Sequence, residues 1–228
     1  MKNFKLVWSA RSECGPNRKK NEDSIYPSTS GNNQPPFKAA VCDGLGGHVS
    51  GDIASKIAAD TLNEKVEDLK KVINQANKQI LQFQDNNPES IGMGTTMTAI
   101  TINDDALMKI AHVGDSRCYV LSDRNLVKVT EDQNVPGYQN VLKQALGSNE
   151  KLNIQEIDFQ LQIGDVILLC SDGLYNEVGE EYIKKKMQDG TSADTLVSEV
   201  LLQDPKDNVS AIMILSLIHI SEPTRRVF

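Results

Sequence analysis

The chain has 228 residues, of which 39% are hydrophobic and 24% charged, and its formal net charge is −7. That length fits one large domain more simply than two small ones, and it is enough to bury a core. The negative charge argues against nucleic acid or an anionic membrane as the main partner, because both favour clustered Lys and Arg. It is compatible with a protein that uses carboxylates to bind metal ions.

No apolar run approaches the length of a membrane-spanning helix, and the first eight residues lack the apolar core of a signal peptide. We therefore expect a cytoplasmic protein. The cysteines Cys14, Cys42, Cys118 and Cys170 are scattered, without a CxxC pair or zinc-finger spacing. This pattern predicts small buried hydrophobic side chains rather than disulfides or zinc ligands.

The first third of the chain predicts two strands followed by two helices. Residues 4–10 indicate a short strand, and the polar stretch 11–36 contains several turn signals. The apolar run 37–42 predicts a buried strand, since it is short and stops at an Asp-Gly pair. Apolar residues then recur every three or four positions, which predicts helices over 50–65 and 67–85.

The remainder predicts mostly strands. Because the apolar period changes to two, strands are expected at 95–102, 106–113, 117–121, 126–130, 154–161, 165–170 and 209–215. Residues 131–140 predict a polar loop, and 141–146 predict one helical turn ended by Gly147. Two further helices are expected at 179–188 and 192–203. Grouped strands with paired helices indicate antiparallel sheets covered by helix pairs, rather than a βαβ repeat.

The last residues differ in character from the rest of the chain. Residues 217–228 continue an apolar strand and then end in a polar segment with a proline and two arginines. We expect one domain over 1–216, with 217–228 as a tail that lies outside the fold or is non-native.

Four aspartates stand where predicted strands end or begin. Asp43, Asp115 and Asp172 each follow an apolar run, and Asp207 directly precedes the last strand. Alone, each would indicate only a turn. Together, like charges at neighbouring strand ends would repel unless a cation lay between them. Oxygen ligands select hard ions such as Mg²⁺ or Mn²⁺, so the pattern predicts a metal-dependent phosphoester hydrolase.

A charged run lies upstream, at residues 18–23. By itself it would indicate a solvated loop. Beside a carboxylate metal site, Arg18 could bind a phosphate with two hydrogen bonds of fixed geometry. Glu22 and Asp23 could hold metal-bound water.

These segments resemble, in order, the motifs of the PP2C-type (PPM) protein serine/threonine phosphatases, and the similarity is greatest to the short bacterial members. The resemblance covers about residues 5–216. The matching motifs are Arg18 with Asn21-Glu22-Asp23, Asp43-Gly44-Leu45-Gly46-Gly47-His48, Gly92-Met93-Gly94-Thr95-Thr96, His112-Val113-Gly114-Asp115-Ser116-Arg117, Ala145-Leu146-Gly147, Ser171-Asp172-Gly173 and Asp207-Asn208.

The resemblance implies an α+β fold, a four-layer αββα sandwich of two antiparallel β-sheets flanked by helix pairs. It implies hydrolysis of phosphoserine and phosphothreonine by water activated between two Mn²⁺ or Mg²⁺ ions. It also implies phosphoprotein substrates, a cognate serine/threonine kinase as the opposing enzyme, and a monomer.

The resemblance assigns roles position by position. Asp43 would bridge two ions, and the Gly44 carbonyl would bind one of them. Asp172 and Asp207 would bind the other ion. Asp115, together with Asp172, would bind a weaker third ion.

The remaining roles belong to the charged run. Glu22 and Asp23 would act through waters, and Arg18 would hold the substrate phosphate. Arg18, Asp43 and Asp172 are thus the expected catalytic residues.

The chain departs from the family pattern in two places. Leu45 stands where some members carry a histidine proposed as a general acid, and we expect His48 and His112 to be structural. The segment between Asp132 and Asn140 is also shorter than the flap of most relatives. These departures leave the general acid unassigned and put substrate recognition and third-ion affinity in question.

Three other functions are compatible with parts of the sequence. Cys118 and Arg124 have the C-x5-R spacing of a cysteine phosphatase, but they lie in a predicted strand without the glycines that such a loop needs. The glycine-rich segment 44–47 is a weak nucleotide-binding signal. A pseudophosphatase that binds phosphoproteins without turnover is the alternative from another class, and the full set of aspartates with Arg18 argues against it.

Overall fold

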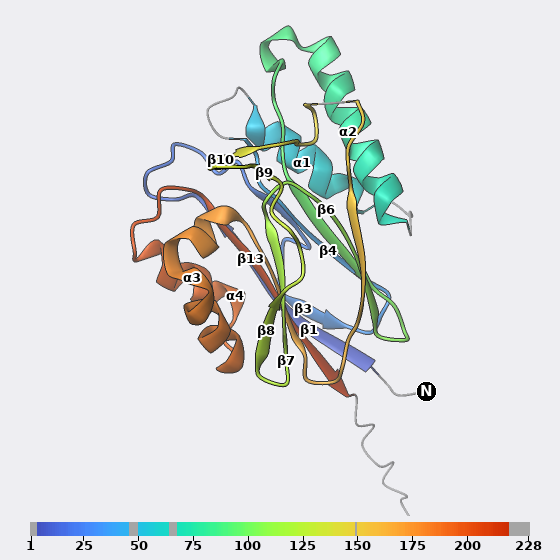
Figure 1. Cartoon of the computed structure of the whole chain (residues 1–228), viewed down its shortest axis with the longest axis vertical. Helices are drawn as coiled ribbons and strands as arrows, with labels where there is room; N and C mark the ends of the chain where they lie inside the picture. Colours follow the sequence, from blue (N-terminus) through green and yellow to red (C-terminus); the bar gives the residue numbers. More distant parts are fainter. Residues whose placement is uncertain (1–3, 46–49, 64–67, 149, 219–228) are drawn as a thin grey trace, which may run out of the picture.

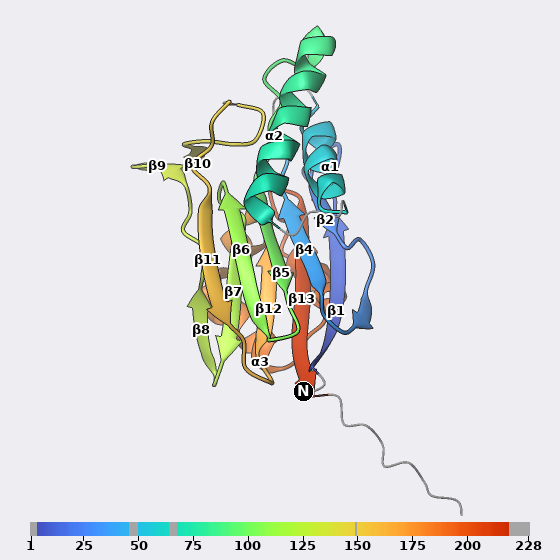
Figure 2. The same ribbon diagram turned by 90° about the vertical axis from the view of Figure 1, so that its right-hand side faces the viewer.

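The computed structural model describes residues 4–45, 50–63, 68–148 and 150–218. Two antiparallel sheets pack face to face, and each carries a pair of helices on its outer side (Figures 1 and 2). This arrangement confirms the expected four-layer αββα sandwich. None of the helices in these ranges combines the length and the apolar character needed to cross a membrane.

The first sheet has the strand order β3-β1-β13-β12-β7-β8. Its strands are β1 (Phe4–Glu13), β3 (Gly31–Asn33), β7 (Arg117–Ser122), β8 (Asn125–Lys128), β12 (Val166–Cys170) and β13 (Val209–Ile218). β1 and β13 pair over their whole length, from Phe4 opposite Ile218 to Glu13 opposite Val209. Its outer face is covered by α3 (Asp172–Gln188) and α4 (Ala193–Leu201).

The second sheet has the order β11-β6-β5-β4-β2. Its strands are β2 (Ser24–Tyr26), β4 (Phe37–Cys42), β5 (Met97–Ile102), β6 (Leu107–Val113) and β11 (Gln155–Gln160). The helices α1 (Gly51–Thr61) and α2 (Leu69–Asn86) cover its outer face, and the short 3₁₀ helix η1 (Pro88–Ser90) follows α2. A separate two-stranded hairpin, β9 (Asn134–Val135) and β10 (Tyr138–Leu142), projects from the sandwich (Figure 2).

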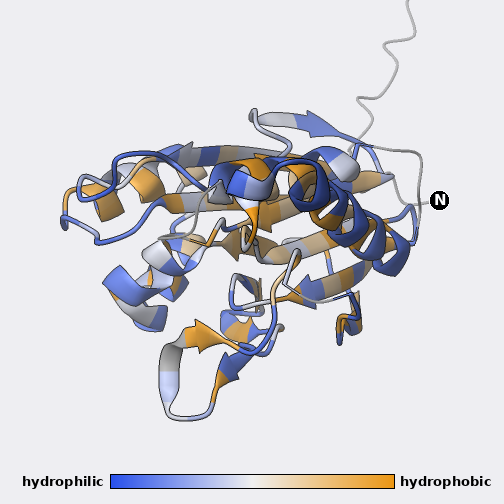
Figure 3. Cartoon of the chain, turned by 90° about the horizontal axis from the view of Figure 1, so that it is seen from above, coloured by the Kyte–Doolittle hydropathy of each residue, from blue (hydrophilic) through white to orange (hydrophobic). Residues whose placement is uncertain are grey.

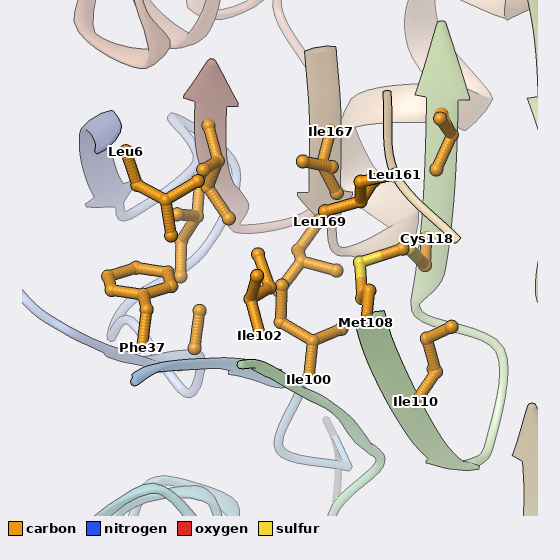
Figure 4. Close-up of a cluster of buried hydrophobic side chains, with 14 of the residues drawn as sticks. Leu6, Phe37, Ile100, Ile102, Met108, Ile110, Cys118, Leu161, Ile167 and Leu169 are labelled. Carbon is orange, nitrogen blue, oxygen red and sulfur yellow. The ribbon is translucent and has the colours of Figure 1, made fainter. Parts of the chain in front are cut away.

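The main core lies between the sheets, where side chains such as Leu6, Phe37, Ile100 and Leu169 meet (Figure 4). The central strands β4, β5 and β12 are largely apolar because both of their faces are buried, whereas the edge strands β8 and β11 carry exposed polar residues. Along β12, Ile167 and Leu169 face this core, while the intervening residues pack under α3 and α4. Hydrophobic residues accordingly gather on the strands (Figure 3). Each fully buried Leu or Ile contributes ~1.5–3 kcal/mol.

Two sequence predictions were wrong in detail. Residues 141–146 are not a helical turn, because β10 runs to Leu142 and pairs with β9 across the Pro136-Gly137 turn. α3 begins at Asp172, seven residues before the predicted helix, with a non-helical Gly179 (φ 74°) inside it. Glycines at 173 and 179 weaken the helical pattern there.

The strands at the ends of the predicted domain also differ. β2 and β3 lie inside the stretch 11–36, where only turns were expected. β13 continues to Ile218, two residues beyond the expected domain boundary. Residues 219–228 lie outside the described ranges, so the expectation about the tail stays a prediction.

Candidate metal and phosphate site

Four aspartates from different strand ends line one cavity of about 790 Å³. Asp43 follows β4, Asp115 lies between β6 and β7, Asp172 opens α3 after β12, and Asp207 precedes β13. The same cavity is lined by Arg18. Because strands of both sheets end here, the sandwich brings together residues that are far apart in the chain.

The carboxylates repel one another. Loss of hydration raises the pKa of Asp172 from 3.8 to about 7, and the charges of Asp115 and Asp207 add to the shift. Burial also raises the pKa of Asp43 well above its ordinary value, with further contributions from Asp23 and Asp172. Burial is likewise the main cause of the raised pKa of Asp115. A cation among these groups would relieve the repulsion and keep them ionised.

The donor chemistry fits a hard divalent ion. Asp172 Oδ1 is a buried oxygen without a hydrogen-bond partner, which is costly unless it binds something else. Across the described ranges, no three acidic, His or Cys side chains are already gathered tightly enough to chelate an ion. The side chain of Asp43 is nevertheless within hydrogen-bonding reach of both Asp23 and Asp172, so several carboxylate oxygens already lie close together.

Asp23 lies deeper than the cavity wall. It is buried, and its Oδ2 accepts a 2.6 Å hydrogen bond from the Ser210 hydroxyl. Burial raises its pKa from 3.8 to about 6, and its side chain is within hydrogen-bonding reach of Asp43. Glu22 is half-buried, and loss of hydration raises its pKa as well. Asp23 thus stands next to Asp43, whereas the charged neighbours of Glu22 are Arg18, Asp52, Asp207 and Lys20.

Arg18 is already paired with a member of the aspartate set. Its guanidinium donates to Asp207 Oδ2 at 2.5 Å and to the Lys206 carbonyl at 3.2 Å. The sequence did not predict this ion pair, because its partners are 189 residues apart. Both side chains keep about 30% of their surface exposed, at 31% and 30%. Arg18 therefore remains accessible to an anion that enters the cavity.

Two glycines let the Asp207 segment approach the site. A Cβ on Gly15 would lie 2.1 Å from the Asp207 carbonyl oxygen, and one on Gly173 would lie 2.1 Å from the Asn208 carbonyl oxygen. No side chain fits at either distance. The segment before β13 therefore packs between Gly15, just after β1, and Gly173 at the start of α3.

Gly44 also lies in a tight place. A Cβ there would meet the Glu22 carbonyl oxygen at 2.4 Å, and the Gly44 N–H donates to that oxygen at 3.1 Å. The chain after β4 is thereby fixed to the loop that carries Glu22 and Asp23.

Asp115 has partners that the sequence did not reveal. Asn134 of β9 donates its side-chain N–H to Asp115 Oδ2 at 3.1 Å, and the Tyr175 hydroxyl donates to the Asp115 carbonyl at 3.0 Å. Asn176, Glu177 and Lys206 join these as unpredicted residues at the site, since they line the cavity. No local motif marks them.

The segment after Asp132, expected to be a short flap, contains the hairpin β9–β10. Its Val141 and Leu142 line the cavity, and Tyr138 is 66% exposed. The hairpin thus supplies an apolar wall beside the carboxylates. Leu45 lines the cavity too and offers no proton donor.

The histidine and cysteine expectations can be followed in part. His112 is buried, with Nδ1 against the Thr98 hydroxyl at 2.8 Å and Nε2 against the Glu131 carbonyl at 3.1 Å, as a structural histidine would be. His48 lies outside the described residues. Cys42, Cys118 and Cys170 are free and buried, as predicted. Cys118 is fully buried inside strand β7, and burial raises the pKa of its thiol, so its position argues against the cysteine-phosphatase interpretation.

Comparison with known proteins agrees with this geometry. The family model described as "Protein phosphatase 2C" matches residues 16–202. The "Serine/threonine phosphatase stp" of Listeria monocytogenes is 31% identical, over 90% of this chain and 93% of that protein. The "Serine/threonine protein phosphatase PstP" of Mycobacterium tuberculosis is 30% identical, over 91% of this chain and 44% of that protein.

Solved structures show the same likeness. The M. tuberculosis PstP/Ppp phosphatase superposes with a TM-score of 0.84 at 28% identity, covering 94% of this chain and all of that one. The catalytic domain of PstP in complex with two manganese ions superposes with a TM-score of 0.82 at 29% identity, covering 94% and 99%. The chain belongs to the protein phosphatase 2C family.

Proposed function

We propose that the protein is a serine/threonine phosphatase that hydrolyses phosphoserine and phosphothreonine with Mn²⁺ or Mg²⁺. The observation that carries the proposal is the buried aspartate cluster, in which Asp172 has an unpartnered oxygen and a pKa raised to about 7 beside the accessible Arg18. Such a cluster needs cations, and the partly exposed guanidinium beside it can bind an anionic phosphate. The names of the relatives support the same substrate class.

We assign the ligands by the pattern of the family. Asp43 and the Gly44 carbonyl would hold one ion, and Asp172 and Asp207, with Asp43 as the bridge, would hold the second. Asp115 and Asp172 would hold a weaker third ion. When bound, such ions lower the pKa of water and offset the negative charge of the phosphoryl group.

The chain's own residues then perform distinct tasks. Arg18 binds the substrate phosphate through the outer face of its guanidinium and orients it toward the aspartates. Glu22 and Asp23 would stabilise water at the edge of the site, since Asp23 lies within hydrogen-bonding reach of Asp43 and Glu22 lies near Arg18 and Asp207. Asn134 and Tyr175 hold Asp115 in place. The apolar residues of β10 shield one side of the cavity from water.

The wider biological setting is also a proposal. Phosphoproteins are the substrates, and a serine/threonine kinase that phosphorylates them is the natural opposing enzyme. We place the protein in the cytoplasm and expect a monomer with a catalytic domain over 1–216.

The test is phosphate release from a phosphothreonine peptide with and without Mn²⁺. Release should require Mn²⁺, stop with EDTA, and stop in Asp172→Ala. Asp158→Ala is the matched control, because Asp158 is an exposed aspartate of β11 outside the cavity lining. Release that survives both EDTA and Asp172→Ala would refute the proposal. Phosphopeptide binding without any release would instead favour the pseudophosphatase.

A further inference from the structure

Thr96 joins the two sides of the aspartate cluster. It is 1% exposed, it lies just before β5, and it lines the cavity between Asp43 and Asp115. Thr96 is not one of the residues assigned above as metal ligands. Its hydroxyl contacts both the Asp43 and the Asp115 segments, and its methyl group packs against the Asp115 segment.

The hydroxyl of Thr96 replaces a backbone acceptor. The Thr96 N–H donates to the Asp43 carbonyl at 2.9 Å, so the two residues face each other as a hydrogen-bonded antiparallel pair. In a regular pair the Asp43 N–H would donate to the Thr96 carbonyl. Here it donates to Thr96 Oγ1 at 2.9 Å, and the Thr96 carbonyl accepts from the Thr95 hydroxyl instead. The ladder thus opens where Asp43 turns into the cavity.

The same hydroxyl reaches the Asp115 turn. Thr96 Oγ1 lies 2.7 Å from Ser116 Oγ. A hydroxyl that accepts from Asp43 N–H still has its own proton to donate, so one side chain can bond to both segments.

The methyl group of Thr96 packs on the other side of the Asp115 turn. A Cβ on Gly114 would lie 2.5 Å from Thr96 Cγ2, so the backbone there is in close contact with this methyl. Gly114 has φ +110°, which only glycine adopts readily. Asp115 is therefore held from both neighbours, Gly114 and Ser116, by one threonine.

We propose, on the basis of the metal-dependent function proposed above, that Thr96 is a positioning residue that sets the spacing of Asp43 and Asp115 for cation binding. It does not touch substrate. The hydroxyl is the group that joins the two segments, so serine should keep most of this role and valine, which lacks the hydroxyl, should lose it. Residues that orient metal ligands typically change metal affinity ~10–100-fold when replaced.

The experiment uses the metal-free full chain. Calorimetric titration with Mn²⁺ should show affinity about 10-fold or more weaker in Thr96→Val than in the wild type, and close to wild type in Thr96→Ser. Hydrogen exchange of the Asp43 amide, measured by NMR without metal, should be faster in Thr96→Val only. Ile100→Val is the control, since it is a fully buried residue of the same strand facing the inter-sheet core. It should lower the melting temperature and leave Mn²⁺ affinity unchanged.

Wild-type Mn²⁺ affinity and slow Asp43 exchange in Thr96→Val would overturn the positioning role, as would an equal loss of affinity in Ile100→Val. If Thr96→Val does not fold, Ser116→Ala removes the other hydroxyl, and unchanged Mn²⁺ affinity there would overturn the role. A wild-type chain that binds no Mn²⁺ refutes the proposed function instead, and Asp43 exchange then still decides whether Thr96 holds that segment.

Discussion

Two charged regions are neighbours in the structure, the aspartate cluster that lines the cavity and the ion pair around Arg117, and they differ in how buried charge is compensated. Around Arg117 the chain neutralises itself, because the guanidinium donates to both Asp132 oxygens and to the Tyr119 hydroxyl. It also lies 3.5 Å above the Tyr175 ring. Asp115, two residues before Arg117 in the chain, belongs to the aspartate cluster, where carboxylates outnumber cationic side chains.

The titration behaviour of the two regions is opposite. Burial opposes the charge of Asp132, but the hydrogen bonds from Arg117 lower its pKa below the ordinary value. In the aspartate cluster, burial and repulsion both raise the pKa values. A region that completes its own charge balance serves structure, whereas a region that lacks counter-charge depends on an ion from outside.

The largest expected effect concerns the aspartate cluster. Asp43→Asn keeps the size of the side chain and removes the charge. Mn²⁺-dependent phosphate release should fall by more than ~10²-fold, since a lost ligand should cost at least as much as a lost supporting residue. The folded state should be retained or stabilised without metal, because one repelling charge is gone. Phosphate release and metal-free melting measure the two effects, and a strong loss of stability would contradict the comparison.

The Arg117 region should behave in the reverse way. Arg117→Ala leaves Asp132 half-buried without its partner and should cost about 2–4 kcal/mol of unfolding free energy, toward the lower end because both side chains keep some exposure. Urea unfolding measures it. The double variant with Asp132→Ala should recover part of the loss, and no recovery would show that the ion pair is not the cause.

Arg18→Ala tests whether Arg18 binds the substrate phosphate or instead supports the metal ligands of the aspartate cluster. We expect the KM for a phosphopeptide to rise about 10-fold, as for a lost charged hydrogen bond of ~1.4 kcal/mol. Mn²⁺ affinity should be unchanged or slightly higher, because Asp207 loses a competing cation. A large loss of Mn²⁺ affinity by calorimetry would show that Arg18 supports the ligands rather than the phosphate.

The smallest expected effect is a pH trend. The folded pKa values of Asp172 (about 7) and Asp23 (about 6) exceed the ordinary 3.8, so the folded state binds more protons than the unfolded state between these values. Without metal, the free energy of unfolding and the Tm should therefore fall as pH rises from about 4 to 7. Thermal melting with Mn²⁺ present should lose this trend. A metal-free Tm that rises over this range would contradict it.

The sequence predicts which aspartates line the cavity better than it predicts the ion pairs and hydrogen bonds among the site residues. Asp43, Asp115 and Asp172 each follow an apolar run that predicts a strand. Their position at strand ends therefore predicts from the sequence alone that they lie together. The pair between Arg18 and Asp207 depends on how β13 lies beside the loop after β1, which no local pattern encodes. The hairpin at 134–142 was not predicted, because its apolar residues follow neither the period of two of a strand nor the three-to-four period of a helix. Its two short strands are joined by a single Pro-Gly turn.

The place of β13 in the first sheet affects how the protein is made. β13 lies between β1 and β12, so the N-terminal strand reaches the rest of its sheet only through the last strand of the domain. Asp207 directly precedes this strand. During synthesis, the sheet and the aspartate cluster can close only after residue 218 has left the ribosome. A nascent chain that stops before Asp207 lacks one carboxylate of the cluster and the strand that joins β1 to β12.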